Sequence, residues 1–297
     1  MRTGAAALFA AAASVLNACA PDASGRASAE TPVDASAATT IATAVDWPKR
    51  VVSLDYCADQ FVLKFVDRAN ILAVSPDATA DFSYMREAAS GVPTVRPLAE
   101  DVLIAKPDLV VRLYGGGPNA TTFFERAGVP VLNVGWSGSI DDVAANVERL
   151  AAGLGAADEG RAVVADMRDR LAALAQSDDG GHALYMTPAG VTTGPGSLIH
   201  EMIVAAGLAN FQEASGWRSL PLERLAYERP DLVAAAFFET RTNHADAWSP
   251  AGHPVARAQL DGPAVARLDG AWTACGAWFL VDAVEALAAA SVAAPVK

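Results

Sequence analysis

The sequence predicts an α/β protein made of two Rossmann-like lobes, each with a central, mostly parallel sheet, joined by one long α-helix. Short apolar runs alternate with helical periods along most of the chain, which is typical of parallel strands connected by helices. Two segments also share one pattern: LAEDVLIAKPDLVV, which begins at Leu98, and PLERLAYERPDLVA, which begins at Pro221. Because each reads as an amphipathic helix, a proline that ends it and a buried strand, the chain contains two similar units.

One glutamate occupies the same place in both copies. Glu100 and Glu223 each stand seven residues before a Pro-Asp-Leu-Val tetrad, so they lie 223 − 100 = 123 positions apart. A single exposed glutamate on a helix usually has no specific functional role, because most charged side chains lie at the surface of any protein. The matched pair therefore carries more information than either residue alone.

The composition fits a folded, acidic protein of two domains. The chain has 297 residues, of which 52% are hydrophobic and 19% charged, enough for two cores of ordinary size. The formal net charge is −12 and the sequence pI is about 4.7. Since a nucleic-acid surface needs clustered positive charge, this balance argues against nucleic acid as a partner.

Residues 1–20 have the pattern of an export signal. Arg2 supplies the positive end, Ala5 to Leu16 the apolar stretch, and Ala18-Cys19-Ala20 the small-x-small form of a cleavage site. Alternatively, Leu16-Asn17-Ala18-Cys19 resembles a lipobox, in which case Cys19 would carry a lipid anchor. Both interpretations place the mature protein outside the cytoplasm.

The N-terminal lobe is expected over residues 47–156, after a flexible tether at residues 21–46 that holds almost no large apolar side chain. Its strands are predicted from branched apolar runs and its helices from apolar side chains at helical spacing. Ser139, with Asp142 three residues on, has the form of a capping box that begins the last helix of this lobe. In chain order the expected elements are strand 51–54, helix 57–66, strand 71–75, the glutamate helix, strand 108–113, helix 121–127, strand 129–134 and helix 140–154.

A connecting helix is expected over residues 157–177 and the C-terminal lobe over residues 178–297. The connector carries a stripe of apolar side chains on one face and lies between the two repeated segments. After a turn at 178–181 the alternation of strands and helices resumes. The expected elements of this lobe are strand 182–186, a glycine-rich turn at 194–196, helix 197–206, the second glutamate helix, strand 231–238 and a final helix 278–290.

Two such lobes joined by a helix are suited to holding a ligand in a cleft between them. In open parallel sheets the crevice lies beyond the carboxyl ends of the strands. Aromatic rings offer flat contact there, and an arginine pairs with anionic groups. For any single aromatic residue core packing is the simpler interpretation, whereas a cluster at strand ends favours a lined cleft. The side chains at predicted strand ends are Tyr56, Tyr84, Tyr114, Trp136 and Arg241.

The order of the motifs resembles a known family. After the N-terminal signal come RVVSLDYCADQFVL, the glutamate helix, KPDLVV, a glycine turn, ERAGVPVLNV, SIDDVAANVERLAAGLG and the connecting helix. This set, which spans essentially Val51 to Leu287, is similar to the class III periplasmic binding proteins, which have a helical backbone and serve ABC importers of cobalamin, ferric siderophores and haem. Each motif alone is weakly specific, whereas the ordered and duplicated set is much more so.

The resemblance implies binding and transport without catalysis. A member of this family is a periplasmic, monomeric carrier without a cofactor, which captures a metal chelate, here cobalamin or another corrinoid or a ferric siderophore, with haem as the alternative. It delivers the chelate to the permease dimer of an inner-membrane ABC transporter. The family's docking glutamates, which meet arginines of the permease, fall on Glu100 and Glu223. Two carboxylates on one face would orient a two-fold partner and raise its rate of encounter.

The resemblance also indicates where the ligand would lie. Trp217, six residues before Glu223, falls on a cage tryptophan of the cobalamin-binding members, and Trp272 lies near another cleft aromatic. Thr94 and Val191 stand where those members have tryptophan and phenylalanine, so the cobalamin cage is incomplete and the identity of the chelate is left open. Tyr84 is the one candidate for an axial ligand of a haem.

Cys57 and Cys275 allow three interpretations. Each begins a predicted helix, and by the resemblance they lie on either side of the cleft. In an oxidising compartment they would form a disulfide bond that clamps the lobes and limits their opening. They could instead be separate buried thiols, or one thiolate, with its pKa lowered by a helix N-terminus, could bind the metal of a chelate.

A bare metal-ion site and an enzyme are less well supported by the sequence. The four histidines are not placed to converge as the three or four ligands that a metal ion needs. A two-lobed hydrolase is the main enzymatic alternative, but the chain contains no Gly-x-Ser-x-Gly elbow and no Gly-x-x-x-x-Gly-Lys loop. A third alternative is a surface lipoprotein whose cleft has lost its ligand. The histidines are His182, His200, His244 and His253.

Overall fold

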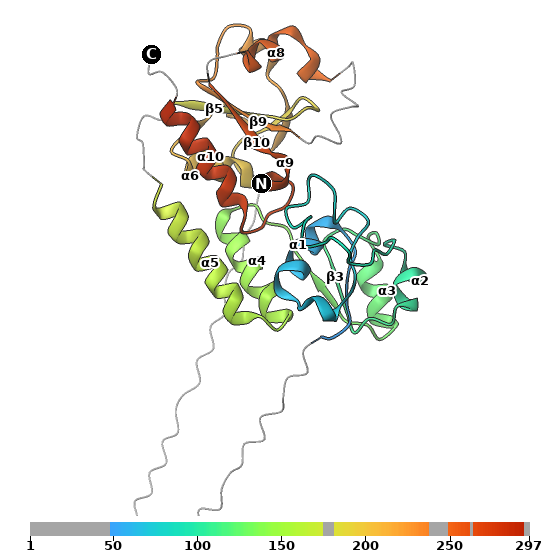
Figure 1. The fold of residues 1–297 in the computed structure, drawn as a ribbon. Coiled ribbons are helices and arrows are strands. Elements are labelled where there is room, and N and C mark those ends of the chain that lie inside the picture. The colour runs from blue at the N-terminus through green and yellow to red at the C-terminus, as the bar shows by residue number, and fades with distance from the viewer. Residues whose placement is uncertain (1–47, 175–180, 238–248, 262–263, 294–297) are drawn as a thin grey trace, which may run out of the picture. The chain divides into compact units, whose positions relative to one another are not determined.

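A computed structural model of the chain describes residues 48–174, 181–237, 249–261 and 264–293. The chain divides into two units, Met1–Val45 and Asp46–Lys297, and every described residue belongs to the second. Figure 1 shows the helices and strands of that unit. The expected signal and tether at residues 1–46, with Cys19, lie outside the described residues, as do Arg241 and His244.

The N-terminal lobe is built on a parallel four-stranded sheet in the order β2–β1–β3–β4. β1 pairs with both β2 and β3, so the first strand lies inside the sheet and is buried along its whole length. The strands are β1 (Val51–Ser53), β2 (Ile71–Ala73), β3 (Leu109–Arg112) and β4 (Val131–Asn133). The helices are α1 (Tyr56–Phe65), the 3-10 turn η1 (Arg68–Asn70), α2 (Ala99–Ile104), α3 (Ala120–Arg126) and α4 (Ile140–Gly153).

The C-terminal lobe repeats this topology. Its four parallel strands lie in the order β7–β5–β9–β10, so that, counted within its own lobe, each sheet has the strand order 2-1-3-4. A two-stranded antiparallel sheet, β6 with β8, is added to this lobe. The strands are β5 (His182–Met186), β6 (Val191–Thr193), β7 (Ala209–Asn210), β8 (Trp217–Ser219), β9 (Leu232–Phe237) and β10 (Val265–Asp269). The helices are the connector α5 (Ala157–Ala172), α6 (Leu198–Ala205), α7 (Leu222–Leu225), η3 (Pro250–Gly252), α8 (Pro254–Leu260), α9 (Gly270–Thr273) and α10 (Leu280–Ala293).

The duplicated Pro-Asp turn makes the same contact in both lobes. Asp108, before β3, accepts the backbone N–H groups of Lys49 and Arg50 at 2.9 and 3.0 Å. Asp231, before β9, accepts the backbone N–H of His182 at 2.9 Å. In each lobe the aspartate therefore ties the start of the third strand to the start of the first. The repeated sequence thus encodes the alignment of two neighbouring strands.

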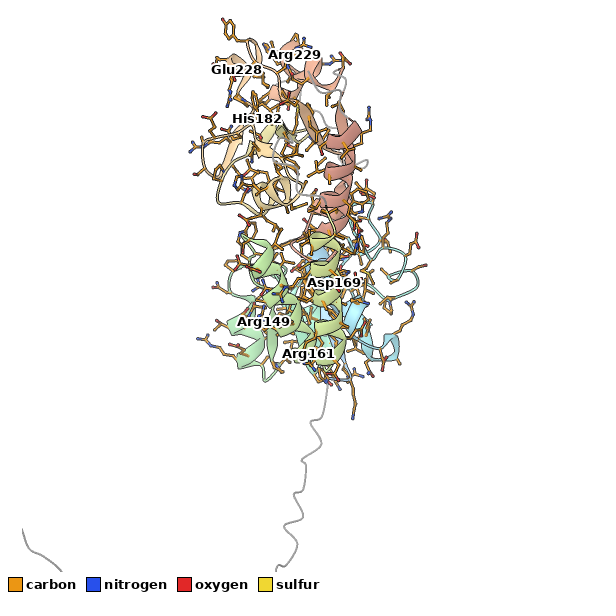
Figure 2. The ribbon with its side chains drawn as sticks, turned by 90° about the vertical axis from the view of Figure 1, so that its left-hand side faces the viewer. Arg149, Arg161, Asp169, His182, Glu228 and Arg229 are labelled. Atoms are coloured by element: carbon orange, nitrogen blue, oxygen red, sulfur yellow. A yellow bond between two sulfur atoms is a disulfide. The ribbon has the colours of Figure 1, made fainter. Side chains whose placement is uncertain are left out.

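The connecting helix α5 contacts both lobes. It packs along α4 and also touches α10 of the C-terminal lobe. Near its end, Arg170 pairs with Asp282 and Glu285 of α10, at 2.7 and 2.6 Å. Figure 2 shows Arg161 and Asp169 on the same helix, where both are exposed. The apolar face of α5 is thus buried while its opposite face carries charge, as its sequence pattern predicts.

The apolar core has a central cluster shared by both lobes and an outer cluster in each. The central cluster contains side chains of α1, α4, α5, α6 and α10. Val102 of α2 and Phe124 of α3 belong to the outer cluster of the N-terminal lobe. Leu225 of α7 and Ala256 of α8 belong to the outer cluster of the C-terminal lobe. Each glutamate-bearing helix, α2 and α7, therefore packs on the face of its sheet that is turned away from the central cluster.

The predicted α/β class, with two mostly parallel sheets, is confirmed. The pair β6–β8 was not predicted, because β8 is a three-residue strand exposed along its length and has no apolar pattern. The final helix begins at Leu280, later than predicted, because Trp278 lies in a turn that packs on the N-terminal lobe. Within the described ranges, no helix combines the length and the apolar character needed to cross a membrane.

Candidate ligand-binding site

A cavity of about 490 Å³ lies between the two lobes. Much of its wall follows the carboxyl ends of parallel strands, at the start of α1 after β1 and in the loops after β4 and β5. The cleft therefore lies where open parallel sheets normally place a ligand. The N-terminal lobe lines it with Tyr56, Cys57, Phe61, Phe82, Leu113 and residues 134–138. The C-terminal lobe lines it with Tyr185, Thr187, residues 196–199, Gly216, Trp217 and residues 273–276.

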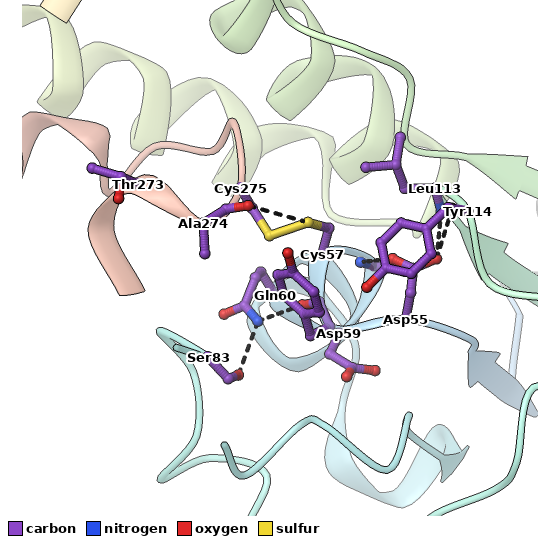
Figure 3. The surroundings of a disulfide bond; sticks show 12 residues. Asp55, Cys57, Asp59, Gln60, Ser83, Leu113, Tyr114, Thr273, Ala274 and Cys275 are labelled. Atoms are coloured by element: carbon purple, nitrogen blue, oxygen red, sulfur yellow. Dashed lines mark hydrogen bonds between the residues drawn. A yellow bond between two sulfur atoms is a disulfide. The ribbon is translucent and has the colours of Figure 1, made fainter. Parts of the chain in front are cut away.

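Tyr56 is held in the cavity wall by the buried aspartate before it. The Oδ1 atom of Asp55 accepts the N–H of Ala58 at 3.0 Å and so caps α1. Its Oδ2 atom accepts three consecutive backbone N–H groups, from residues 113–115, at 2.7, 3.0 and 2.9 Å. Figure 3 shows this carboxylate between the start of α1 and the loop after β3. One side chain thus fixes both Tyr56 and Leu113 in the wall.

Tyr114 stands behind Tyr56 rather than in the wall. The ring centroid of Tyr56 is 5.9 Å from that of Tyr114 and 4.9 Å from that of Phe82, and both contacts are edge-to-face. Tyr114 is half-exposed, and burial of its hydroxyl, aided by nearby Tyr56 and carboxylates, raises its pKa well above the usual value. It therefore supports the ring of Tyr56 as a neutral phenol.

Two tryptophans, one from each lobe, form the rim of the cavity. Trp136 lies on the loop after β4 and is 80% exposed, and Trp217 lies on β8 and is 53% exposed. The ring of Trp217 meets that of Tyr185, with 6.2 Å between centroids. Large aromatic side chains left open to solvent beside a cavity are a common feature of binding surfaces. Together the two rings can cover opposite sides of a flat ligand.

Tyr185 and Thr187 form the C-terminal side of the wall. Tyr185 is buried, and burial raises its pKa to about 12, partly offset by a hydrogen bond with Thr273, so its phenol is neutral. The hydroxyl of Thr187 donates to the carbonyl of Val191 and accepts its N–H, both at 3.1 Å. This exchange closes the turn that leads from β5 into β6.

The glycine-rich segment at 194–197 is a tight turn that ends in a helix cap. The Oγ atom of Ser197 accepts the N–H of His200 at 3.2 Å and donates to the carbonyl of Gly194 at 3.0 Å. A side chain at Gly194 would place its Cβ 2.2 Å from the carbonyl oxygen of Ala214, so only glycine fits. The turn brings Gly196 and Ser197 to the cavity.

The two cysteines are joined by a disulfide bond that lines the cavity (Figure 3). Cys57 lies in the first turn of α1, and Cys275 lies between α9 and α10. Their Cα atoms are 5.5 Å apart although the residues are separated by 218 positions. Of the three interpretations of these cysteines, the structure has the disulfide, so neither sulfur is a thiolate able to bind a metal.

The wall is aromatic and apolar, with small polar groups. Among the described residues that line the cavity there is no Asp, Glu, Lys, Arg or His side chain. In the described part of the chain, no three His, Cys, Asp or Glu side chains come together as a metal site would require. The arrangement can hold a flat ligand through aromatic stacking and can direct a few hydroxyl and backbone groups at its edges.

Tyr84 and Trp272 lie outside the cavity wall. The hydroxyl of Tyr84 donates to Asp282 at 2.9 Å, and its ring stacks on Phe279 with 4.2 Å between centroids. Burial, together with the Asp282 carboxylate, raises the pKa of Tyr84 to about 12. Trp272 is partly buried and packs against the central core cluster. Both side chains are thus used in contacts within the protein. Thr94 and Val191 do not line the cavity either.

Several lining residues were not singled out from the sequence. Phe61 reads as part of the apolar face of α1, and Phe82 lies in a segment without regular helix or strand, so neither gave a signal. Tyr185 and Thr187 lie just before and just after the end of β5. A search that included the last residue pair of each strand as well as the following loop would have found these two.

Both repeated glutamates are exposed and have no partner among the described residues. Glu100 lies in the first turn of α2 and Glu223 in the first turn of α7. Neither carboxylate makes a hydrogen bond or ion pair with the described part of the chain. The arginines nearest in sequence, Arg96 and Arg224, are each paired with another carboxylate, at 2.8 and 2.7 Å. The two glutamates are therefore available to an external cation.

A large exposed apolar side chain follows each glutamate by four residues. Ile104 is 79% exposed and Tyr227 is 91% exposed. Each stands three residues before the proline of its repeat, so the two positions are equivalent. Glu100 and Ile104 are neighbours because both lie on α2, whereas Tyr227 lies in the turn after α7. Each lobe thus presents an exposed carboxylate followed in sequence by an exposed apolar side chain.

Two α/β lobes, a connecting helix and an aromatic cavity between the lobes define a two-lobed ligand-binding protein. The chain belongs to the periplasmic binding protein family, whose model matches residues 51–245. The family consists of binding proteins, and its class III members have this fold. The predicted resemblance is therefore confirmed.

Curated relatives and solved structures agree with this assignment. The chain is 31% identical over 199 residues to a cobalamin-binding protein of Halobacterium salinarum, a match that covers 63% of this chain and 53% of the relative. The chain thus spans about half the length of the curated relatives it matches.

Solved structures share the fold at lower identity. A periplasmic haem-binding protein from Pseudomonas aeruginosa is 22% identical with a TM-score of 0.60, over 83% of this chain and 92% of that one. The vitamin B12-binding protein BtuF of Vibrio cholerae is 19% identical with a TM-score of 0.57, over 83% and 98%. A protein of an Fe³⁺-hydroxamate transport system from Saccharomonospora viridis is 19% identical with a TM-score of 0.60, over 82% and 93%.

Proposed function

We propose that this chain is the extracytoplasmic binding component of an ABC importer, which captures a metal chelate between its lobes and delivers it to the permease. The observation that carries this proposal is the aromatic cavity formed by both lobes, with an exposed carboxylate, unpaired within the described part of the chain, at the equivalent place on each. The protein acts as a monomer and without catalysis, and the chelate is its cargo rather than a cofactor.

A corrinoid is the chelate that the site supports best. The described wall offers aromatic rings and small polar groups rather than charged side chains, which suits the amide-bearing face of a corrin. The similarity to a cobalamin-binding protein of Halobacterium salinarum supports the same choice. A haem is less well matched, because Tyr84, the expected axial ligand, is engaged by Asp282 outside the wall. A ferric hydroxamate, which also lacks carboxylates, is the main competitor.

Calorimetric titration of the purified protein decides between these ligands. Cyanocobalamin, haemin and ferrichrome are titrated separately, and we expect binding of cyanocobalamin with a dissociation constant of about 1 μM or tighter, which corresponds to about −8 kcal/mol. Tight binding of ferrichrome or haemin alone would change the ligand but keep the carrier role. Binding of none of the three, together with turnover of an ester or phosphate substrate, would overturn the proposal in favour of an enzyme.

The permease partner is supported by the surroundings of the two glutamates. In this proposal Glu100 and Glu223 each meet an arginine of a two-fold permease, and Ile104 and Tyr227 cover the neighbouring apolar surface. Paired charges at such an interface orient the complex and speed its formation. The apolar neighbours add area that is removed from water on docking.

Export through residues 1–20 completes the proposal. A soluble periplasmic form cleaved after the signal and a form anchored by a lipid on Cys19 are both compatible with the sequence. Mass spectrometry of the mature protein from its host distinguishes them, because a lipid on Cys19 adds a diacylglyceryl mass that the variant Cys19→Ser loses. An unprocessed N-terminus in the cytoplasmic fraction would contradict export.

A further inference from the structure

The segment from Cys275 to Asp282 belongs by sequence to the C-terminal lobe but contacts the N-terminal lobe. The ring of Trp278 lies edge-on to those of Phe61 and Phe65 of α1, with 5.8 Å between centroids in both cases. Such edge-to-face contacts stabilise beyond the apolar area they bury. The start of α10 is therefore packed into the other lobe.

Tyr84 extends this contact on the N-terminal side. Its ring stacks on Phe279 and its hydroxyl donates a hydrogen bond to Asp282, so Tyr84 contacts the start of α10 through both the ring and the hydroxyl group. At Gly276 the backbone passes so close that an added Cβ would lie 3.2 Å from Ser137 of the N-terminal lobe and 3.3 Å from Leu198 of the C-terminal lobe. The two lobes meet closely here, so that a methyl group added at Gly276 would push its neighbours apart by a few tenths of an ångström.

The disulfide bond makes this contact covalent. Cys57 of α1 is joined to Cys275, which directly precedes the packed segment, and both lie in the cavity wall. The lobes are thus linked at the cavity by a bond as well as through the connector α5. The rim tryptophans, Trp136 and Trp217, have no such link and are exposed.

We propose that the Cys57–Cys275 disulfide and the packed segment 275–282 form a clasp that fixes the floor of the ligand cavity. The lobes then separate only at the rim, where Trp136 and Trp217 lie, and the chelate enters and leaves past these two rings. The bond is also a determinant of how long the ligand stays, because loss of the clasp lets the floor open as well. This last statement rests on the proposed carrier function.

The clasp is tested by a double-mutant cycle with Cys57→Ser, Cys275→Ser and the double variant. Hydrogen exchange is measured by mass spectrometry on peptides covering residues 56–65 and 277–285. Each single variant breaks the same bond, so we expect each to accelerate exchange in both peptides at least tenfold and the double variant to add nothing further. Unchanged exchange in these peptides, or effects of the two substitutions that simply add, would overturn the clasp.

Two controls keep the result interpretable. Lys64→Ala removes the ion pair of α1 with Glu159 of α5, at 3.0 Å, while leaving the clasp intact, and is expected to leave exchange in the peptide 277–285 unchanged. Wild-type protein reduced after folding with dithiothreitol, which closes to its own cyclic disulfide as two protein thiols form, replaces the serine variants if these fail to fold. We expect the reduced wild type to show the same tenfold acceleration of hydrogen exchange in both peptides. If exchange did not accelerate, the clasp would equally be overturned.

The ligand arm uses cyanocobalamin in stopped-flow dissociation. We expect release from the double variant to be about tenfold faster than from the oxidised wild type, which corresponds to 1.4 kcal/mol. If hydrogen exchange were faster in the double variant but cyanocobalamin left both proteins at the same rate, the clasp would remain a structural contact. Its role in how long the ligand stays bound would then be refuted. If cyanocobalamin fails to bind even the oxidised wild type, the corrinoid assignment fails, while the exchange cycle still decides whether the clasp exists.

Discussion

The two lobes agree in their frame and differ in the parts that surround the ligand. Both sheets have the strand order 2-1-3-4, and in both lobes the repeated aspartate ties the third strand to the first. Each lobe also presents an exposed glutamate, without a partner among the residues that the structure describes, followed by an exposed apolar residue. The cavity walls are less alike. Each lobe contributes a helix start, that of α1 or α6, and loops after its strands, but only the C-terminal lobe adds an exposed strand residue, Trp217 of β8, and the segment 273–276 before α10.

This difference would separate the two interactions that the proposed carrier function requires. A two-fold partner is met best by two equivalent surfaces, and the equivalent parts of the lobes are those on their outer faces. A single asymmetric ligand is met best by unlike walls, and the unlike parts are those at the cavity. In the proposed function, the equivalent outer faces of the two lobes would serve docking and the unlike parts of the cavity wall would serve the ligand.

The strongest test of the equivalence removes both glutamates. We expect the variant Glu100→Ala/Glu223→Ala to lose roughly a hundredfold or more in chelate uptake by cells, because truncating one partner of an interface charge pair costs about 2–5 kcal/mol. Its affinity for cyanocobalamin should not change, since neither residue lines the cavity. The two single variants should lose uptake equally if the lobes meet equivalent sites.

A matched control is Glu125→Ala, which removes another exposed glutamate of the N-terminal lobe, on α3. It should leave uptake unchanged. If Glu125→Ala also lost uptake, the effect of the double variant would be explained by net charge rather than by docking at Glu100 and Glu223. If only one of these two single variants lost uptake, the lobes would not be equivalent.

The next prediction concerns the hydrogen bonds that hold a cavity-lining loop in each lobe. In the N-terminal lobe the buried carboxylate of Asp55 accepts four backbone N–H groups, whereas in the C-terminal lobe the hydroxyl of Thr187 closes a turn. We expect Asp55→Asn to lower the free energy of unfolding by about 3 kcal/mol and Thr187→Ala by about 1 kcal/mol, since hydrogen bonds to an ionised group are worth more. Urea unfolding of both variants measures the difference, and equal losses would contradict it.

The rim tryptophans test whether the unlike walls share the ligand. Trp217 is held on a strand and against Tyr185, while Trp136 stands on a loop and is more exposed. We expect Trp217→Ala to weaken cyanocobalamin binding by roughly tenfold or somewhat more, and Trp136→Ala by about fivefold, because the less rigid ring loses more freedom on binding. Phe123→Ala, which removes a half-exposed ring outside the cavity, is the control and should not change the affinity. If Trp136→Ala weakened binding more than Trp217→Ala, the idea that β8 holds Trp217 in place for the ligand would be refuted.

The frame of the molecule was more predictable from the sequence than the cavity was. Parallel sheets, the connector and the repeat follow from apolar periodicity and from a duplicated motif, and these depend on local patterns. The capping box at Ser139 and Asp142 is confirmed for the same reason, since its two hydrogen bonds lie within four residues.

The cavity depends on contacts between distant segments, which local patterns do not encode. Tyr56, predicted from its place after a strand, and Trp217, predicted from the resemblance, do line the cavity. Tyr84 and Trp272 instead pack against other side chains of the protein. Phe82 had no signal at all, because it enters the wall from a segment without regular helix or strand. The disulfide was one of three open interpretations, because pairing across 218 positions is a property of the folded chain.

A further difference between the lobes is a buried carboxylate, Asp59, that has no counterpart in the described C-terminal lobe, and its expected effect is about as small as that of Thr187→Ala. Asp59 accepts hydrogen bonds from Ser53 and Ser75, yet burial raises its pKa from 3.8 to about 6. The folded protein therefore holds this proton more tightly than the unfolded chain does. The resulting stability is complete below about pH 4 and is lost as the pH rises through about 6.

Relative to Asp59→Asn, which does not titrate, the wild type should thus gain roughly 1 kcal/mol in free energy of unfolding between pH 7 and pH 5. Urea unfolding of both proteins at the two pH values measures this gain, and hydrogen exchange should place it in the N-terminal lobe. A difference between the two proteins that does not vary with pH would show that Asp59 titrates as an ordinary carboxyl. If the gain in protection from hydrogen exchange appeared in the C-terminal lobe, protonation of Asp59 would stabilise the two lobes together rather than the N-terminal lobe alone.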